Sequence, residues 1–184
     1  MRIIAGTWRG RRLLTPKDVR IRPTSDRARE ALFDILDHGK PPLRGAQFLD
    51  LFCGTGAVGV EALSRGAAEV LLVDNDAEAL QLAKANIAHL GSPPGIRVMA
   101  ADATRLGSAR TTFDLVFLDP PYRSDLAAPT LATLIDGWLA PDALCSVELM
   151  ASEPFEPPDG FTALDSRKYG KARIEILRWG GESG

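Results

Sequence analysis

The chain has 184 residues, of which 45% are hydrophobic and 25% charged, and its formal net charge is −2. That length suits one domain with a single core and leaves little chain for a second. The sequence has no apolar export signal and no run of about eighteen apolar residues. Its two cysteines, Cys53 and Cys145, are far apart and without ligand-spaced neighbours, so they form no disulfide framework or zinc site. We therefore predict a reduced, cytoplasmic protein without a membrane segment or a metal site.

The charges are unevenly distributed along the chain. Residues 1–30 hold nine lysine or arginine residues against three acids, a local balance of +6, so the remaining 154 residues carry −8. Such a basic segment is typical of a surface that meets a polyanion, although it also occurs as a solvated arm without a partner. Trp8 and several glycines lie among the arginines, which favours a nucleic acid as the partner.

The first predicted elements precede the main core. Residues 2–7 and 11–15 are expected to pair as a short β-hairpin that turns at Gly10, within a basic extension formed by residues 1–23. A helix then begins after Ser25, which is a capping residue, and ends before Gly39.

Apolar strands alternate with helices through the rest of the chain. Strands of this kind, separated by helices, predict a mostly parallel sheet covered on both faces, and the tight turn at Gly170-Lys171 predicts a C-terminal antiparallel hairpin. We expect one Rossmann-like α/β domain over residues 1–184. The predicted strands are residues 47–52, 69–74, 96–101, 113–118, 143–149, 161–169 and 172–179, and the predicted helices are residues 57–65, 77–90 and 126–139.

Polar signals follow several strands, at the edge of the sheet where ligands bind in such folds. Gly54, Gly56 and Gly59 have the GxGxxG spacing between a strand and a helix, which lets a ligand approach the backbone. Asp74 ends the second strand of the sheet, where a carboxylate can accept both hydroxyls of a ribose, and Asp102 ends the third, beside an adenine. Each signal alone also fits an ordinary turn, but together they indicate bound adenosine.

Asp50 helps to choose between a dinucleotide and S-adenosylmethionine. It lies four residues before Gly54, where a carboxylate would attract an ammonium group and repel a pyrophosphate. This favours S-adenosylmethionine. An NAD-dependent oxidoreductase remains an alternative, although it leaves Asp50 and Asp119 without a role.

The tetrapeptide Asp119-Pro120-Pro121-Tyr122 follows the apolar run Phe113–Leu118. Its prolines carry no backbone N–H, so the main chain offers carbonyl acceptors, to which Asp119 adds a charged acceptor and Tyr122 a face for stacking. These groups can hold the amino group of a nucleobase, although a strand followed by a proline turn has the same pattern. A DNA adenine-N6 methyltransferase would use the same tetrapeptide, and an RNA-binding module without catalysis would need only the basic segment.

Asp50 to Gly56, Asp74, Asp102 and the tetrapeptide resemble the motifs of class I S-adenosylmethionine-dependent methyltransferases that act on exocyclic amines. Residues 1–6, 9–13 and above all 22–33 resemble the RsmD family, the 16S rRNA guanine-966 N2-methyltransferases. The resemblance implies direct methyl transfer to a guanine of small-subunit ribosomal RNA, either naked or in a particle. From the sequence we expect no membrane as a partner, and no obligate protein partner is evident.

The same resemblance implies roles for three sets of residues. The cofactor would be bound by Thr24, Asp50, Phe52, Gly54, Thr55, Gly56, Asp74, Asn75, Asp102 and Ala103. The catalytic set would be Asp119, Pro120, Pro121 and Tyr122, and the RNA would be bound by Arg2, Arg9, Arg11, Arg12 and Arg22.

Overall fold

The computed structural model describes residues 1–16 and 26–180, so Arg22, Thr24 and the predicted cap Ser25 lie outside the described residues. The strands are β1 (Gln47–Leu51), β2 (Glu69–Asp74), β3 (Ile96–Ala100), β4 (Phe113–Leu118), β5 (Leu139–Met150), β6 (Phe161–Tyr169) and β7 (Ala172–Trp179). The helices are α1 (Asp26–Asp37), α2 (Ala57–Ser64), α3 (Ala77–His89) and α4 (Ala127–Leu134).

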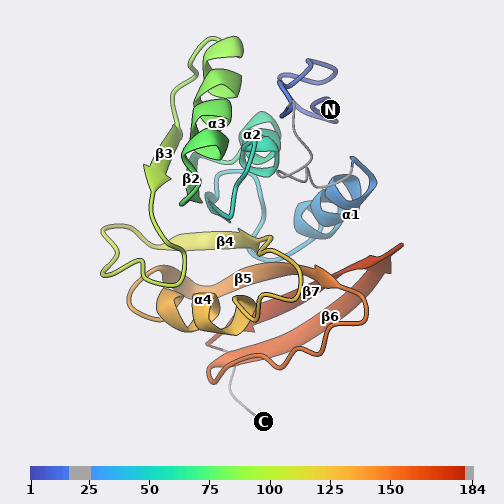
Figure 1. The fold of residues 1–184 in the computed structure, drawn as a ribbon, viewed down its shortest axis with the longest axis vertical. Coiled ribbons are helices and arrows are strands. Elements are labelled where there is room, and N and C mark those ends of the chain that lie inside the picture. The colour runs from blue at the N-terminus through green and yellow to red at the C-terminus, as the bar shows by residue number, and fades with distance from the viewer. Residues whose placement is uncertain (17–25, 181–184) are drawn as a thin grey trace.

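The strands form a seven-stranded sheet in the order β3-β2-β1-β4-β5-β7-β6 (Figure 1). Strands β1 to β5 pair in parallel, whereas β7 is antiparallel to both β5 and β6. The predicted fold class, a mostly parallel sheet that closes with an antiparallel hairpin, is therefore confirmed. The order of the parallel strands reverses between β1 and β4, which is where such sheets bind ligands.

Helices cover both faces of the sheet because the central strands are apolar on both sides. In β1, Phe48 belongs to the core cluster under α1, α2 and α3, while its neighbour Leu49 belongs to the cluster under α4. Figure 1 shows α4 on the opposite side of the sheet from the three other helices. This alternation directs Asp50, two residues after Phe48, toward the face that carries α2.

The boundary between α4 and β5 differs from the prediction. The helix ends at Leu134 and the strand already begins at Leu139, whereas a helix over residues 126–139 and a strand over 143–149 were predicted. Gly137, with φ +86°, turns the chain after the helix. Trp138 then stacks on Phe113 with ring centroids 6.0 Å apart, and its carbonyl accepts the Phe113 N–H at 2.8 Å, which pulls this segment into the sheet.

The opening segment pairs with itself as predicted, but more briefly. It forms a single antiparallel bridge between Arg2 and Arg12, with Gly10 at φ +81° in the turn, instead of two full strands. The paired strands end early because the N–H groups of Ile4 and Ala5 turn toward Glu61 of α2. We call residues 1–16 the basic arm. None of the helices within residues 1–16 and 26–180 is long and apolar enough to cross a membrane.

Candidate active site at the carboxyl edge of the sheet

The turn between β1 and α2 is built on left-handed backbone. Phe52, Gly54 and Gly56 have φ values of 58°, 53° and 74°. A Cβ on Gly56 would lie 2.8 Å from Leu72 Cδ1, so the turn packs directly on β2 at a position that only glycine fills without displacement. The Gly56 N–H donates to the Cys53 carbonyl at 2.8 Å, which closes the turn. We call residues 52–56 the cofactor turn.

Asp74, at the end of β2, binds the backbone of the cofactor turn. Its Oδ2 accepts the Gly54 N–H at 2.9 Å, and its Oδ1 accepts the Asp76 N–H at 3.0 Å. A carboxylate has about four lone-pair sites, so acceptor capacity remains for two ribose hydroxyls. Asp76 caps α3 by accepting from Glu78 and Ala79, and Asn75 lies exposed between the two aspartates.

Asp50 is buried at the end of β1, with its carboxylate against α2. Its Oδ2 accepts the Gly59 N–H at 2.9 Å. Its pKa is raised from 3.8 to about 7, chiefly by burial and to a lesser extent by the nearby charge of Asp74, while the hydrogen bond from Gly59 lowers it. Gly59 is required by packing, since a Cβ there would overlap Leu72. An ammonium group close to Asp50 would restore its ionised form, so this acid suits a cationic ligand.

Asp102 lies after β3 and is exposed. Its Oδ1 accepts both the backbone N–H of Thr104 at 2.9 Å and the Thr104 hydroxyl at 2.7 Å, and these bonds hold the pKa of the carboxyl below its usual value. Ala103 between them is buried. The two residues predicted to bind adenine, Asp102 and Ala103, therefore lie in a tight turn that favours the ionised form of Asp102.

The tetrapeptide Asp119-Pro120-Pro121-Tyr122 begins where β4 ends, next to the cofactor turn. Leu118 pairs with Leu51, and the Asp119 N–H donates to the Leu51 carbonyl at 3.4 Å. Pro120 is buried, Pro121 is exposed, and Asp119 and Tyr122 are half-buried. The sheet thus brings the two predicted sets, for cofactor and nucleobase, to adjacent strand ends across the switch point.

Glu148 is a site residue that the sequence analysis missed. It lies in β5 with 4% of its surface exposed, and its Oε1 accepts the Tyr122 hydroxyl at 3.1 Å. Val147 pairs with Leu118, so Glu148 follows on β5 at the level where Asp119 follows on β4. Its sequence signal was that it is the one acid in the predicted strand 143–149.

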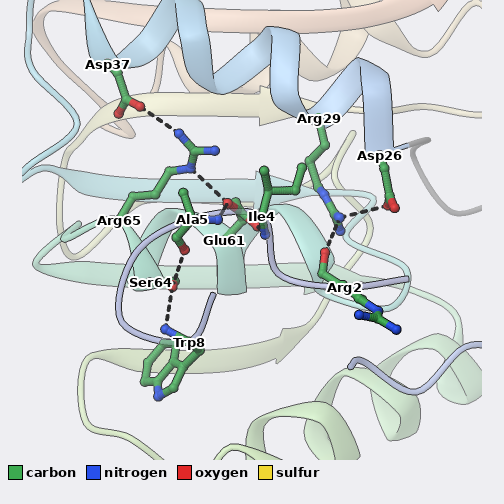
Figure 2. A network of polar contacts seen from close by, with 10 residues as sticks. All are labelled: Arg2, Ile4, Ala5, Trp8, Asp26, Arg29, Asp37, Glu61, Ser64 and Arg65. Atoms are coloured by element: carbon green, nitrogen blue, oxygen red, sulfur yellow. Dashed lines mark hydrogen bonds and ion pairs between the residues drawn. The ribbon is translucent and has the colours of Figure 1, made fainter. Parts of the chain in front are cut away.

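The basic arm is docked on α2 by buried polar groups (Figure 2). The fully buried carboxylate of Glu61 accepts the N–H groups of Ile4 at 2.8 Å and Ala5 at 2.9 Å. The Ser64 hydroxyl donates to the Ala5 carbonyl at 2.7 Å and accepts the Trp8 N–H at 3.0 Å. Through these contacts the described part of the predicted basic extension packs on the helix that follows the cofactor turn.

The arginines of the basic arm point mostly outward. Arg2, Arg9, Arg11 and Arg12 are exposed, and Arg11 also donates to the carbonyl of His89 at 2.9 Å. The guanidinium of Arg29 in α1 donates to the Arg2 carbonyl, which fastens the arm to the first helix as well (Figure 2). The fold therefore presents a basic surface from a segment whose backbone is anchored.

The strand order, the cofactor turn after β1 and the acids that end β1 and β2 define a class I methyltransferase. A family model described as Conserved hypothetical protein 95 matches residues 1–178. The chain belongs to this family, which is the RsmD family.

Similar proteins support this membership over most of the chain. The Ribosomal RNA small subunit methyltransferase D of Escherichia coli K12 is 43% identical over 149 residues, which cover 80% of this chain and 74% of the relative. The protein of the same name from Haemophilus influenzae is 35% identical over 175 residues, covering 92% and 89%. The solved structure of the Escherichia coli protein yhhF has a TM-score of 0.85 at 35% identity and covers 99% of both chains.

Proposed function

We propose that the protein transfers a methyl group from S-adenosylmethionine to the exocyclic N2 of a guanine in small-subunit (16S) ribosomal RNA. One observation carries the proposal: the cofactor turn and the amine-binding tetrapeptide follow paired strands, β1 and β4, and Asp119 is hydrogen-bonded to Leu51. A methyl donor and an amino acceptor bound there would be neighbours. The names of the relatives supply the ribosomal RNA.

The residues of the cofactor half fit S-adenosylmethionine. Asp74 retains acceptor capacity for the ribose, and buried Asp50 gains from a nearby ammonium group. We assign the methionine part of the cofactor to the cofactor turn, and its adenine to Asp102 and Ala103. Phe52 and Asn75 would lie at the borders of the cofactor site. When bound, the cofactor supplies an electrophilic methyl group on its sulfonium. Thr24, also assigned to this set, lies outside the described residues.

The residues of the nucleobase half orient the amine. Asp119 and the Pro120 carbonyl accept its two hydrogens and fix the plane of the base, while the ring of Tyr122 stacks on it. Holding the nitrogen about 3 Å from the methyl carbon would supply much of the acceleration. The methylated nitrogen must also lose a proton, and Asp119, which accepts a hydrogen bond from it, is the group that we assign to receive that proton. The guanine must be unpaired or flipped out of its helix at a cost of a few kcal/mol.

The exposed arginines of the basic arm would bind RNA phosphates and set the register of the substrate without choosing the base. Replacing Arg9, Arg11 and Arg12 together with alanine should weaken RNA binding. It should also reduce the slope of log affinity against log salt by about 0.7 for each phosphate that the arm no longer neutralises. An unchanged slope would show that the arm is only solvated.

We also propose that residues 1–184 act as one methyltransferase domain and that the protein works in the cytoplasm. Arg22, the remaining arginine of the predicted RNA-binding set, lies outside the described residues. Neither a membrane nor an obligate protein partner enters this proposal.

Methyl-labelled S-adenosylmethionine tests the proposal when it is incubated with the protein and, separately, with small ribosomal subunits, naked 16S rRNA and DNA. We expect label in one or both ribosomal substrates and none in DNA. Whether naked RNA or the subunit is labelled identifies the form of the substrate. Label in DNA would favour the adenine-N6 alternative, and the absence of label from all three would contradict methyl transfer.

A further inference from the structure

Asn86 in α3 joins two distant segments of the chain through its side chain. It is fully buried, its Oδ1 accepts the Leu14 N–H at 2.7 Å, and its Nδ2 donates to the carbonyls of Leu14 at 3.2 Å and Thr55 at 3.0 Å. A side-chain amide has two donor hydrogens, so both are used. The basic arm and the cofactor turn are therefore bonded to the same amide group.

On the side of the arm, Asn86 acts as a neighbouring strand would. It binds both the N–H and the carbonyl of Leu14, whose side chain is 45% exposed. The next residue toward the N-terminus, Leu13, is buried beside Val60 and Leu90. The backbone of Leu14, and not its side chain, fastens this end of the arm.

On the side of the cofactor turn, Asn86 fixes one peptide plane. The Thr55 carbonyl belongs to the peptide bond whose N–H, on Gly56, donates to the Cys53 carbonyl at 2.8 Å. Both polar atoms of this peptide are therefore held. Glycine permits the plane to rotate when a bond is broken, and an unpaired buried carbonyl is costly.

We infer that Asn86 is a positioning residue that couples docking of the basic arm to the geometry of the cofactor turn. The inference rests on the proposed function, because it assigns the turn to the cofactor and the arm to RNA. Since one amide holds both segments, a ligand that orders either of them lowers the cost of ordering the other, and such coupling is reciprocal. RNA held by the arm would then favour cofactor binding, and cofactor would favour a docked arm.

Hydrogen exchange of the unmodified protein gives the first test. S-Adenosylhomocysteine serves as the probe, because it occupies the cofactor site without reacting. We expect it to slow exchange of the Leu14 amide by about fivefold or more, the low end of ordinary coupling between sites.

Asn86→Ala gives the second test, with Ser64→Ala as a matched control. Ser64 holds residues 5 and 8 of the arm on α2 and makes these hydrogen bonds away from Thr55. We expect Asn86→Ala to raise the Kd for S-adenosylhomocysteine by about five- to tenfold and to uncouple arm exchange from the ligand. Ser64→Ala should speed exchange near residues 5 and 8 but leave the Leu14 amide protected, because Asn86 still holds it, and the Kd should stay within about twofold.

The outcomes separate this inference from the proposed function. Failure of the unmodified protein to bind S-adenosylhomocysteine would contradict the proposed function itself. Binding that leaves Leu14 exchange unchanged would overturn the coupling, as would an Asn86→Ala variant that is folded and binds like the unmodified protein. If Asn86→Ala does not fold, the exchange of the unmodified protein decides.

Discussion

The site at the carboxyl ends of the strands has two halves: the cofactor half, with Asp50, Asp74 and the cofactor turn, and the nucleobase half, with residues 119–122. The two halves use their acids differently. In the cofactor half, Asp50 and Asp74 bind backbone N–H groups of Gly59 and Gly54, so the acids shape the main chain around them. In the nucleobase half, Pro120 and Pro121 have no N–H to offer, and a side-chain hydrogen bond joins Tyr122 to Glu148. The first half is therefore preorganised by its own acids, while the second, under the proposed function, would use its acceptors to hold a substrate.

Asp119→Ala should have the largest effect, and that effect should be confined to the nucleobase half of the site. Loss of a preorganised polar group at a reacting centre commonly costs about 10²–10³-fold in rate, so we expect methyl transfer to fall by that factor. The Kd for the cofactor should stay near that of the unmodified protein. Single-turnover transfer and calorimetric binding measure the two quantities.

Asp114→Ala is the matched control for that variant. Asp114 lies near the start of β4, the strand that Asp119 follows, and accepts the Gln47 N–H at 2.8 Å. It should cost stability without a comparable loss of transfer. Near-normal transfer by Asp119→Ala would remove Asp119 from the proposed mechanism.

Asp74→Ala should damage the cofactor half. It removes the acceptor for Gly54 and the proposed ribose contact, and hydrogen bonds to a charged group contribute about 1.5–3 kcal/mol, which is a roughly 10- to 150-fold rise in Kd. Asp76→Ala, two residues away, removes only the cap of α3. Equal affinities for the two variants would contradict the role given to Asp74.

Tyr122→Phe should have a smaller effect on the nucleobase half. The ring can still stack, but the bond to Glu148 is removed, so we expect a few-fold rise in KM for RNA at nearly constant cofactor affinity. Glu148→Gln completes a double-mutant cycle with it. Strictly additive effects in that cycle would show that the two side chains act independently.

The raised pKa of buried Asp50 predicts that stability depends on pH. Its pKa is 3.8 when unperturbed and about 7 in the folded chain, so between these values the folded state keeps a proton that the unfolded state has lost. The free energy of unfolding of the cofactor-free protein should therefore fall as pH rises through this window and level off above it. Urea unfolding at several pH values measures this. Asp50→Asn should flatten that part of the profile of unfolding free energy against pH. An unaltered profile in this variant would contradict the role given to Asp50.

Strand ends were predictable because apolar runs stop at polar residues. Asp74 and Asp119 stand at such points, and the rules of parallel sheets then bring them to one edge. The end of α4 was not predictable in the same way. Trp138 lies against the sheet, directly before β5, because it stacks on Phe113, a partner 25 positions earlier that no local pattern reveals.

The residues that the sequence analysis missed have backbone atoms or distant side chains as partners. Glu61 binds the N–H groups of Ile4 and Ala5, 57 and 56 positions away, and Asn86 binds Leu14, 72 positions away. In a helical pattern these polar side chains look like solvent-facing ones. The folded chain brings the basic arm against them, and only then do they become buried and specific.

The most direct test of the central claim is the identity of the methylated atom. RNA that has reacted with the protein and labelled S-adenosylmethionine can be digested to nucleosides and separated by chromatography with mass detection. We predict that the label is found in N2-methylguanosine, and that its rate of appearance falls by about 10²–10³-fold with Asp119→Ala. Label in N6-methyladenosine, or in a methyl group on carbon or ribose, would contradict methyl transfer to the guanine amine.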